Sequence, residues 1–139
     1  MDSMLYIEWS DKNILGITII DEQHRGIVTT INSFYYFIQK GCGRDAIKPT
    51  LNMLEQYTKL HFQTEEDLLE ESGYRKFDEP WLTRHINLHK ELMRKTIDIA
   101  LDPKACEDPH IALKFLKAWW LDHINVEDRQ YVAYVKGKL

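Results

Sequence analysis

The sequence predicts an all-α protein, an antiparallel up-down-up-down four-helix bundle that follows an irregular N-terminal arm. Apolar residues recur at steps of three and four along four stretches of the chain, which is the spacing of one face of an α-helix. Glycine, or aspartate with a nearby proline, marks where these stretches end or begin, and the connections between them are short. Short connections place successive helices antiparallel. A chain of 139 residues is expected to form one domain, residues 1–139.

The first helix is expected after a non-periodic lead, residues 1–18, which contains Trp9 and Gly16. Gly41 and Gly43 follow this helix, and glycine suits the left-handed conformation that ends one. Its inward stripe is Ile20, His24, Ile27, Val28, Ile31, Phe34 and Ile38.

The second helix is expected from about residue 45 to residue 72, with Gly73 after it. Pro49 falls in or near its first turn, where the missing N–H does little harm. The inward stripe of this helix is Leu51, Leu54, Thr58, His61, Glu65 and Leu68.

The third and fourth helices begin with the same signal, an aspartate cap and a proline in the first turn. Asp78 precedes the third helix, and Asp108 precedes the fourth, which is expected to reach about Lys136. Of the adjacent Trp119 and Trp120, the stripe favours Trp120 as the inward residue. The two stripes are Leu82, His85, His89, Leu92, Thr96 and Ile99, and Leu113, Leu116, Trp120, His123, Ile124, Asp128, Tyr131 and Val135.

The composition is that of an ordinary soluble globular protein, with 44% hydrophobic and 29% charged residues. A net charge of −4 gives no electrostatic reason to expect nucleic-acid or membrane binding. No apolar run approaches the roughly 20 residues of a membrane span, and the N-terminus does not resemble a signal peptide. Cys42 and Cys106 lack CxxC spacing, so we expect two free thiols and a cytoplasmic location.

Histidines and carboxylates occupy positions on all four inward stripes. His61 and Glu65 are four residues apart, as are His85 and His89, and this spacing stacks two side chains on one helix face. Asp128 follows His123 by five residues, a rotation of about 140° on an α-helix, so it suits a bridging role better than chelation. The inward set is His24, His61, Glu65, His85, His89, His123 and Asp128.

Such a set in a protein core predicts bound metal, because a buried unpaired carboxylate costs several kcal/mol, in order of magnitude. Seven ligands exceed what one tetrahedral zinc takes. The absence of sulfur argues against copper(I) and iron–sulfur clusters, and the mixture of nitrogen and oxygen argues against calcium or magnesium. Iron, manganese or a zinc pair remain. Two ions with two bridging carboxylates and a solvent-derived bridge leave one position open for a small molecule.

The residues of this set resemble the bacterial hemerythrin-like domains, and the resemblance covers nearly the whole chain. The stretches Ile7-Glu8-Trp9 and Gly16-Ile17 to Asp21 resemble the N-terminal arm of that family. The matching ligand motifs are Asp21-Glu22-Gln23-His24, His61-Phe62-Gln63-Thr64-Glu65, His85-Ile86-Asn87-Leu88-His89 and His123-Ile124-Asn125-Val126-Glu127-Asp128.

The resemblance implies reversible O2 binding at a non-heme di-iron centre with an oxo or hydroxo bridge, for oxygen sensing, storage or delivery. His85, His89 and His123 are then the ligands of one iron. His24 and His61 are those of the second, open iron, and the two carboxylates bridge the pair. An apolar wall that excludes water would slow autoxidation. Its candidates, for each of which core packing is an equally good explanation, are Ile124, Phe62, Trp120, Ile27 and Ile31.

Two other functions stay open at this point. One is a di-iron enzyme acting on O2, peroxide or nitric oxide, and the other is an iron store or iron sensor. No further acid, base or nucleophile stands out on the inner faces, which disfavours the enzyme. Domains of this kind occur alone and within signalling proteins, so a signalling-domain partner is an open expectation. Glu66, Glu127 and His110 are expected to face solvent.

Overall fold

The computed structural model describes residues 5–138, and of residues 120–122 and 125 the backbone alone. Within these residues the chain is helical and has no strand, which confirms the all-α prediction. No helix in the described chain is both long enough and apolar enough to cross a membrane. The long elements are α1 (Thr18–Gln39), α2 (Gly43–Glu71), α4 (Glu79–Leu101) and a fourth rod formed by α6 (Pro109–Trp119), η2 (Trp120–Glu127), η3 (Asp128–Tyr131) and α7 (Val132–Lys136).

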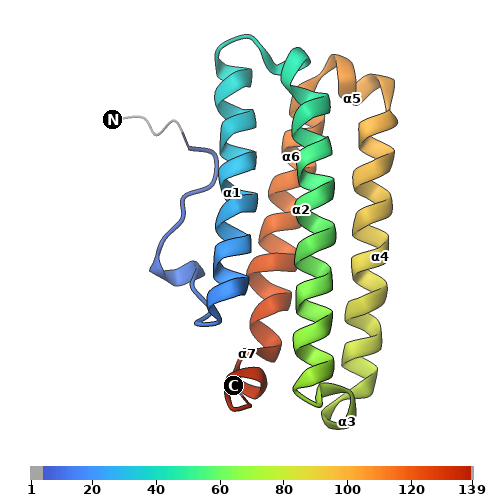
Figure 1. Ribbon diagram of the computed structural model, residues 1–139. Helices are drawn as coiled ribbons and strands as arrows, with labels where there is room; N and C mark the ends of the chain where they lie inside the picture. The colour runs from blue at the N-terminus through green and yellow to red at the C-terminus, as the bar shows by residue number, and fades with distance from the viewer. Residues whose placement is uncertain (1–4, 139) are drawn as a thin grey trace.

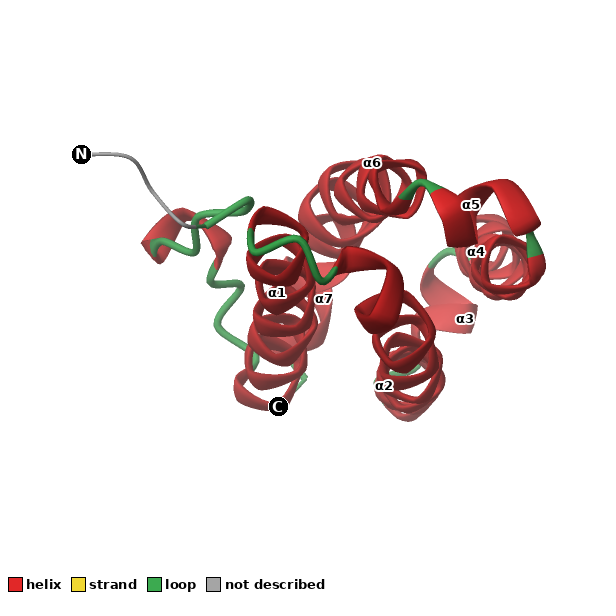
Figure 2. Cartoon of the chain, turned by 90° about the horizontal axis from the view of Figure 1, so that it is seen from above, coloured by secondary structure: helices red, strands yellow, loops and turns green. Residues whose placement is uncertain are grey.

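The four rods lie side by side along their length (Figure 1). In that view the chain rises through α1, descends through α2, rises through α4 and descends through α6. Seen from above, α1, α6, α4 and α2 surround a common interior (Figure 2). The short helices α3 (Tyr74–Phe77) and α5 (Pro103–Glu107) lie in the connections at opposite ends.

The helix ends follow the predicted signals, with one difference. Gly41 and Gly73 adopt left-handed φ values of 79° and 82° after α1 and α2. The Asp78 carboxylate accepts a hydrogen bond from the Trp81 N–H at 3.1 Å and caps α4. However, α2 begins at Gly43, earlier than expected, so Pro49 lies inside the helix.

Residues ahead of α1 are hydrogen-bonded to Asn32 and Asp21 of that helix. The Asn32 amide accepts hydrogen bonds from the N–H groups of Tyr6 (2.9 Å) and Ile7 (2.8 Å) and donates one to the Ile7 carbonyl (2.8 Å). Ile7 is buried in the core. The segment then passes through the short 3₁₀ turn η1 (Asp11–Asn13) before α1 begins.

A close approach between α1 and α2 sets the spacing of these two helices. A Cβ atom at Gly26 of α1 would lie 2.7 Å from the Tyr57 ring of α2, closer than real Cβ contacts come. Glycine therefore allows the two helices to approach. They carry His24 two residues before Gly26 and His61 about one turn after Tyr57.

The buried apolar residues form two clusters, and the polar set lies between them along the helices. The larger cluster lies toward the α5 end and includes Ile27, Ile31, Phe34, Leu51, Leu54, Leu92, Leu113 and Leu116. The smaller lies toward the α3 end and consists of Leu15, Ile17, Ile20, Leu69, Tyr74, Leu82, Tyr131 and Val135. On α1, for example, His24 falls between Ile20 of one cluster and Ile27 of the other, which places a polar layer inside an otherwise apolar interior.

The fourth rod is not the single α-helix that the periodicity predicts. It turns into a π-helix at Trp120–Glu127 and a 3₁₀ turn at Asp128–Tyr131. The Asp128 N–H donates to the His123 carbonyl, the i to i+5 bond of a π turn, so the two residues lie one turn apart. The wider turn also shifts the phase of the stripe. Periodicity predicts that Trp120, and not Trp119, points inward. Trp119 is buried in the core, so this prediction is wrong for Trp119. The Trp120 side chain lies outside the described residues.

Candidate metal centre

The structure brings all seven predicted residues together in the polar layer. Each is 2% exposed or less, and they come from α1, α2, α4 and the fourth rod. They form two groups whose ligand atoms lie within 4.8 Å of one another, and neither group of the described residues includes a cysteine. The groups are Glu65, His85, His89 and His123, and His24, His61 and Asp128.

The smaller group converges on one carboxylate oxygen. The Asp128 Oδ2 atom lies 3.0 Å from His24 Nε2 and 3.2 Å from His61 Nε2, and the two nitrogens are 3.2 Å apart. Two ligand atoms that each lie about 2.1 Å from one ion, at right angles, are about 3.0 Å apart. The spacing in this group therefore fits coordination of a single cation.

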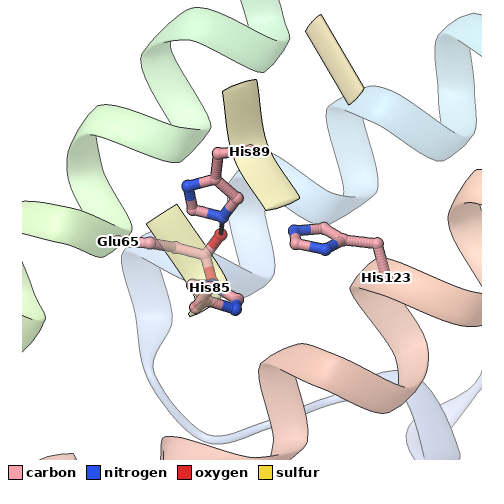
Figure 3. A group of neighbouring side chains, drawn as sticks. All are labelled: Glu65, His85, His89 and His123. Atoms are coloured by element: carbon pink, nitrogen blue, oxygen red, sulfur yellow. Dashed lines mark ion pairs between the residues drawn. The ribbon is translucent and has the colours of Figure 1, made fainter. Parts of the chain in front are cut away.

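The larger group is somewhat wider. Glu65 Oε1 is 3.4 Å from His89 Nε2, and Glu65 Oε2 is 3.7 Å from His85 Nε2. Figure 3 shows the four side chains converging, with Glu65 from α2, His85 and His89 from α4, and His123 from η2. All three histidines present Nε2 to a carboxylate oxygen of the site.

Both carboxylates reach both groups. Glu65 Oε1 lies 3.0 Å from His61 Nε2 of the smaller group as well as near His89. The second oxygen of Asp128, Oδ1, lies 3.6 Å from His123 Nε2 and 3.8 Å from His85 Nε2. Each carboxylate thus spans the two sets of imidazoles, which is the arrangement that bridging of two cations requires.

Several buried polar atoms of the site make no hydrogen bond among the described residues. They are Glu65 Oε1, Asp128 Oδ1, His89 Nε2 and both ring nitrogens of His85 and His123. An unsatisfied buried polar group costs about 1–3 kcal/mol, so a cluster of them demands an explanation. Cations between the nitrogens and oxygens explain the Nε2 and carboxylate atoms, because each of these atoms can serve as a ligand.

The protonation states of two of the histidines, His24 and His123, suit metal binding. Burial lowers the pKa of His24 to about 3, with the nearby His61 adding to the effect. Burial likewise lowers the pKa of His123 to about 2. Both imidazoles are therefore neutral at physiological pH, which is the form that donates a lone pair to a cation.

The two carboxylates differ in their tendency to ionise. Burial opposes ionisation of Glu65, but His61, with His85 and His89, holds the pKa of Glu65 well below its usual range. Burial and the negative charge of Glu65 raise the pKa of Asp128 well above its usual range. Two adjacent buried carboxylates do not ionise together without added positive charge, which cations provide.

Two of the histidines are oriented by side chains that the sequence did not identify. His61 Nδ1 donates to Gln23 Oε1 at 3.0 Å, and Gln23 Nε2 donates to Thr64 Oγ1 at 2.9 Å, which fixes the amide orientation. His89 Nδ1 donates to Glu66 Oε2 at 2.8 Å. A proton on Nδ1 leaves the Nε2 lone pair for a cation.

These contacts correct two of the solvent-facing assignments. Glu66 is half-buried and bonded to His89, and Glu127 is half-buried and pairs with Arg84 at 3.0 and 3.2 Å. Each is adjacent in sequence to a residue of the inward stripe and contacts the neighbouring helix α4. Periodicity along one helix cannot predict a contact with a second helix. His110 is exposed, as predicted. A further residue, Tyr131, donates to Glu65 Oε2 at 2.7 Å.

Apolar side chains cover the centre on its α5 side. Ile27, Ile31, Phe62 and Ile124 belong to the larger core cluster and are each 4% exposed or less. The Phe62 ring stacks on His89 with a centroid separation of 3.7 Å and meets the His123 ring at 5.3 Å. Of the predicted wall, the Trp120 side chain alone lies outside the described residues, and Trp119 instead lies parallel to His123 at 6.5 Å.

Comparisons with known proteins agree with this geometry. Residues 15–135 match the family model described as the hemerythrin HHE cation binding domain. The chain is 34% identical to a bacteriohemerythrin of Pseudomonas aeruginosa and 31% identical to one of Stenotrophomonas maltophilia, in each case over 98% of this chain and 86% of the relative. A bacteriohemerythrin of Clostridium acetobutylicum is 29% identical over 89% of this chain and 97% of its own length. The chain therefore belongs to the hemerythrin family, and its buried histidines and carboxylates form two groups with the spacing of metal ligands.

Proposed function

We propose that this protein binds O2 reversibly at a non-heme di-iron centre, for oxygen sensing, storage or delivery. The unit is a single domain over residues 1–139, an antiparallel four-helix bundle with an N-terminal arm, and its location is the cytoplasm. His85, His89 and His123 hold one iron, and His24 and His61 hold the second, which keeps an open position. Glu65 and Asp128 bridge the two irons, together with an oxo or hydroxo group.

One observation carries the proposal: each of the two carboxylates spans both histidine groups. Glu65 lies within 3.0 Å of His61 and 3.4 Å of His89, and Asp128 within 3.0 Å of His24 and 3.6 Å of His123. A single cation would not need two carboxylates placed in this way. These residues would hold two ferrous ions, which together would supply the two electrons that reversible O2 binding requires.

The chain's own side chains orient the ligands and keep water away. Gln23 and Glu66 fix the rings of His61 and His89 through their Nδ1 atoms. Tyr131 directs one oxygen of Glu65. Ile27, Ile31, Phe62 and Ile124 exclude water on the α5 side, which favours release of O2 over irreversible oxidation.

The experiment is to load the protein with Fe(II) without air and follow its visible spectrum through repeated cycles of O2 and vacuum. We expect absorption bands that appear with O2 and disappear under vacuum over several cycles. Immediate irreversible oxidation with turnover of peroxide or nitric oxide would show a di-iron enzyme. Iron uptake and release without any O2-dependent band would show an iron store or sensor.

A matched pair of histidine variants separates the site from general effects. His61→Ala removes a buried imidazole of the centre, whereas His110→Ala removes an exposed one. We expect the first to lose iron and O2 bands, and the second to behave as the unsubstituted protein. Two retained irons in His61→Ala would refute the ligand assignment.

A further inference from the structure

Aromatic rings form a continuous series from one histidine of the centre to the α3 end of the bundle. The Trp81 indole stacks on the His85 imidazole, with centroids 4.6 Å apart and planes within 14°. Trp81 contacts Tyr74 at 5.1 Å, and Tyr74 contacts Tyr134 at 5.1 Å. The three rings come from α4, α3 and α7, and α3 and α7 lie at the same end of the bundle (Figure 1).

The series leads from the interior to the surface. His85 is fully buried and Tyr74 is 3% exposed, whereas Trp81 and Tyr134 are half-buried. The last ring, Tyr134, stacks on Phe77, which is 62% exposed. Both polar atoms on the way are hydrogen-bonded: Trp81 Nε1 donates to Gln130 Oε1 at 2.7 Å, and the Tyr134 hydroxyl donates to the Ser72 carbonyl at 3.1 Å.

The rings of this series are all of the oxidisable kind, Trp or Tyr, where Phe or Leu would pack as well. The other side of the centre differs. Trp119 lies parallel to His123 at 6.5 Å, but its other described ring neighbour is Phe62, which resists oxidation. An electron can therefore pass from ring to ring toward the centre on the Trp81 side, whereas among the described side chains no second Trp or Tyr ring adjoins Trp119.

We propose that Trp81, Tyr74 and Tyr134 form a path that carries oxidising equivalents from the iron centre to the surface when hydrogen peroxide reacts there. This path rests on the proposed di-iron function. Peroxide takes up two electrons and two protons and becomes two waters. The electrons pass from the path to the centre one at a time. The oxidised Tyr134, which is half-buried at the surface, releases its phenol proton to solvent and regains one when it is reduced. A small reductant at the α3 end restores the rings, so that one hydrogen peroxide and one ascorbate give two waters and one dehydroascorbate.

The path protects the histidine ligands of the metal from oxidation. The Trp81 ring is in van der Waals contact with His85, so it is the nearest oxidisable side chain to that imidazole. An oxidising equivalent that stayed at the centre would attack buried histidines, whose loss would release the metal. Transfer to Tyr134 moves it to a surface that a reductant can reach.

The test uses the full chain loaded with iron and treated with hydrogen peroxide, first without and then with ascorbate. Radicals are trapped by rapid freezing and identified by electron paramagnetic resonance, and oxidised residues are located by peptide mass spectrometry. We expect Trp and Tyr radicals, oxidation at Trp81, Tyr74 and Tyr134, and loss of both when ascorbate is present. The metal-free chain should show neither.

Two variants interrupt the path and a third is the matched control. Trp81→Phe keeps an aromatic ring against His85, and Tyr74→Phe removes one hydroxyl and leaves the ring next to the ligand unchanged. We expect both to lose oxidation at Tyr134 and to lose iron faster in peroxide, with oxidation at the histidines. Tyr35→Phe, on α1 and outside the path, removes a hydroxyl from a ring that stacks on Tyr6, and it should match the unsubstituted protein in radical yield and in iron retention.

The possible results separate this path from the proposed function. Iron content and O2 bands are measured first, and a chain that takes up no iron contradicts the proposed function and the path together. A chain that binds iron and O2, but whose Tyr74→Phe variant still oxidises Tyr134 fully, contradicts the path alone. Equal oxidation of Tyr36, an exposed tyrosine of α1 outside the path, would do the same.

Discussion

The α2 helix and the fourth rod each supply a histidine and a carboxylate, but they do so with different helical turns. On α2, a regular α-helix, Glu65 follows His61 by four residues. On the fourth rod Asp128 follows His123 by five, across a π turn closed by the Asp128 N–H and the His123 carbonyl. Glutamate is longer than aspartate by one methylene, so the pairs combine a longer side chain with a tighter turn and a shorter side chain with a wider one. Each combination brings a carboxylate between the two histidine groups.

The largest effect is expected from removal of either bridging carboxylate. Glu65→Ala and Asp128→Ala each take away oxygen atoms that lie near both histidine groups. Because the positions of both irons depend on them, both variants should lose iron from both positions. Metal analysis of the protein purified after anaerobic loading measures this. If one variant lost a single iron and kept the other firmly bound, that carboxylate would not be a bridge.

Loss of iron should also destabilise the protein. A ligand that binds the folded state alone adds about 4 kcal/mol at a free concentration of 1,000 times its dissociation constant. We therefore expect a lower unfolding midpoint for the iron-free chain than for the loaded chain, and no such difference in Glu65→Ala.

A deletion in the fourth rod tests the comparison directly. Removing Val126, which is 52% exposed, would place Asp128 four residues after His123, as on α2. The shorter aspartate would then no longer reach His24 and His61, so we expect loss of the iron that these two histidines hold. Combining the deletion with Asp128→Glu should restore it, because this pair would reproduce that of α2.

Helix content measured by circular dichroism controls for unfolding of the deletion variant. A deletion variant that keeps wild-type iron content without the longer side chain would show that the π turn does not set the reach of Asp128.

The same comparison shows what the sequence could and could not predict. Periodicity placed all seven polar residues inward. Six of them lie on stripes with an α-helical pitch, and the seventh, Asp128, departs from that pitch by only one residue. It misplaced Trp119, which lies three residues after Leu116 and four before His123, so an α-helical stripe admits Trp119 and Trp120 equally well. The roles of Gln23 and Glu66 depend on how neighbouring helices face each other, which a pattern within one helix does not contain.

A smaller effect is expected at the side chains that orient histidines. Gln23→Leu and Glu66→Leu remove the partners of His61 Nδ1 and His89 Nδ1. Loss of such a partner lowers metal affinity by roughly 10- to 100-fold. Competition with an iron chelator should show a weaker iron at the His61 position in the first variant and at the His89 position in the second. Glu22→Leu, an exposed carboxylate next to Gln23 in sequence, is the control and should have no effect.

The smallest effect is expected at Tyr131. Tyr131→Phe leaves Glu65 Oε2 without the hydroxyl that donates to it at 2.7 Å. Loss of one partner from a buried acceptor costs about 1–3 kcal/mol. Chemical denaturation of the iron-loaded protein should report this loss, with both irons still bound. An unchanged free energy of unfolding would show that the hydrogen bond contributes nothing to the loaded centre.

The most direct test of the two-metal centre is anaerobic titration of the metal-free protein with Fe(II), with the bound iron counted per chain. The two histidine groups, joined by Glu65 and Asp128, predict saturation at two irons per chain. Saturation at one iron, or no tight binding, would contradict the assignment of the two carboxylates as bridges.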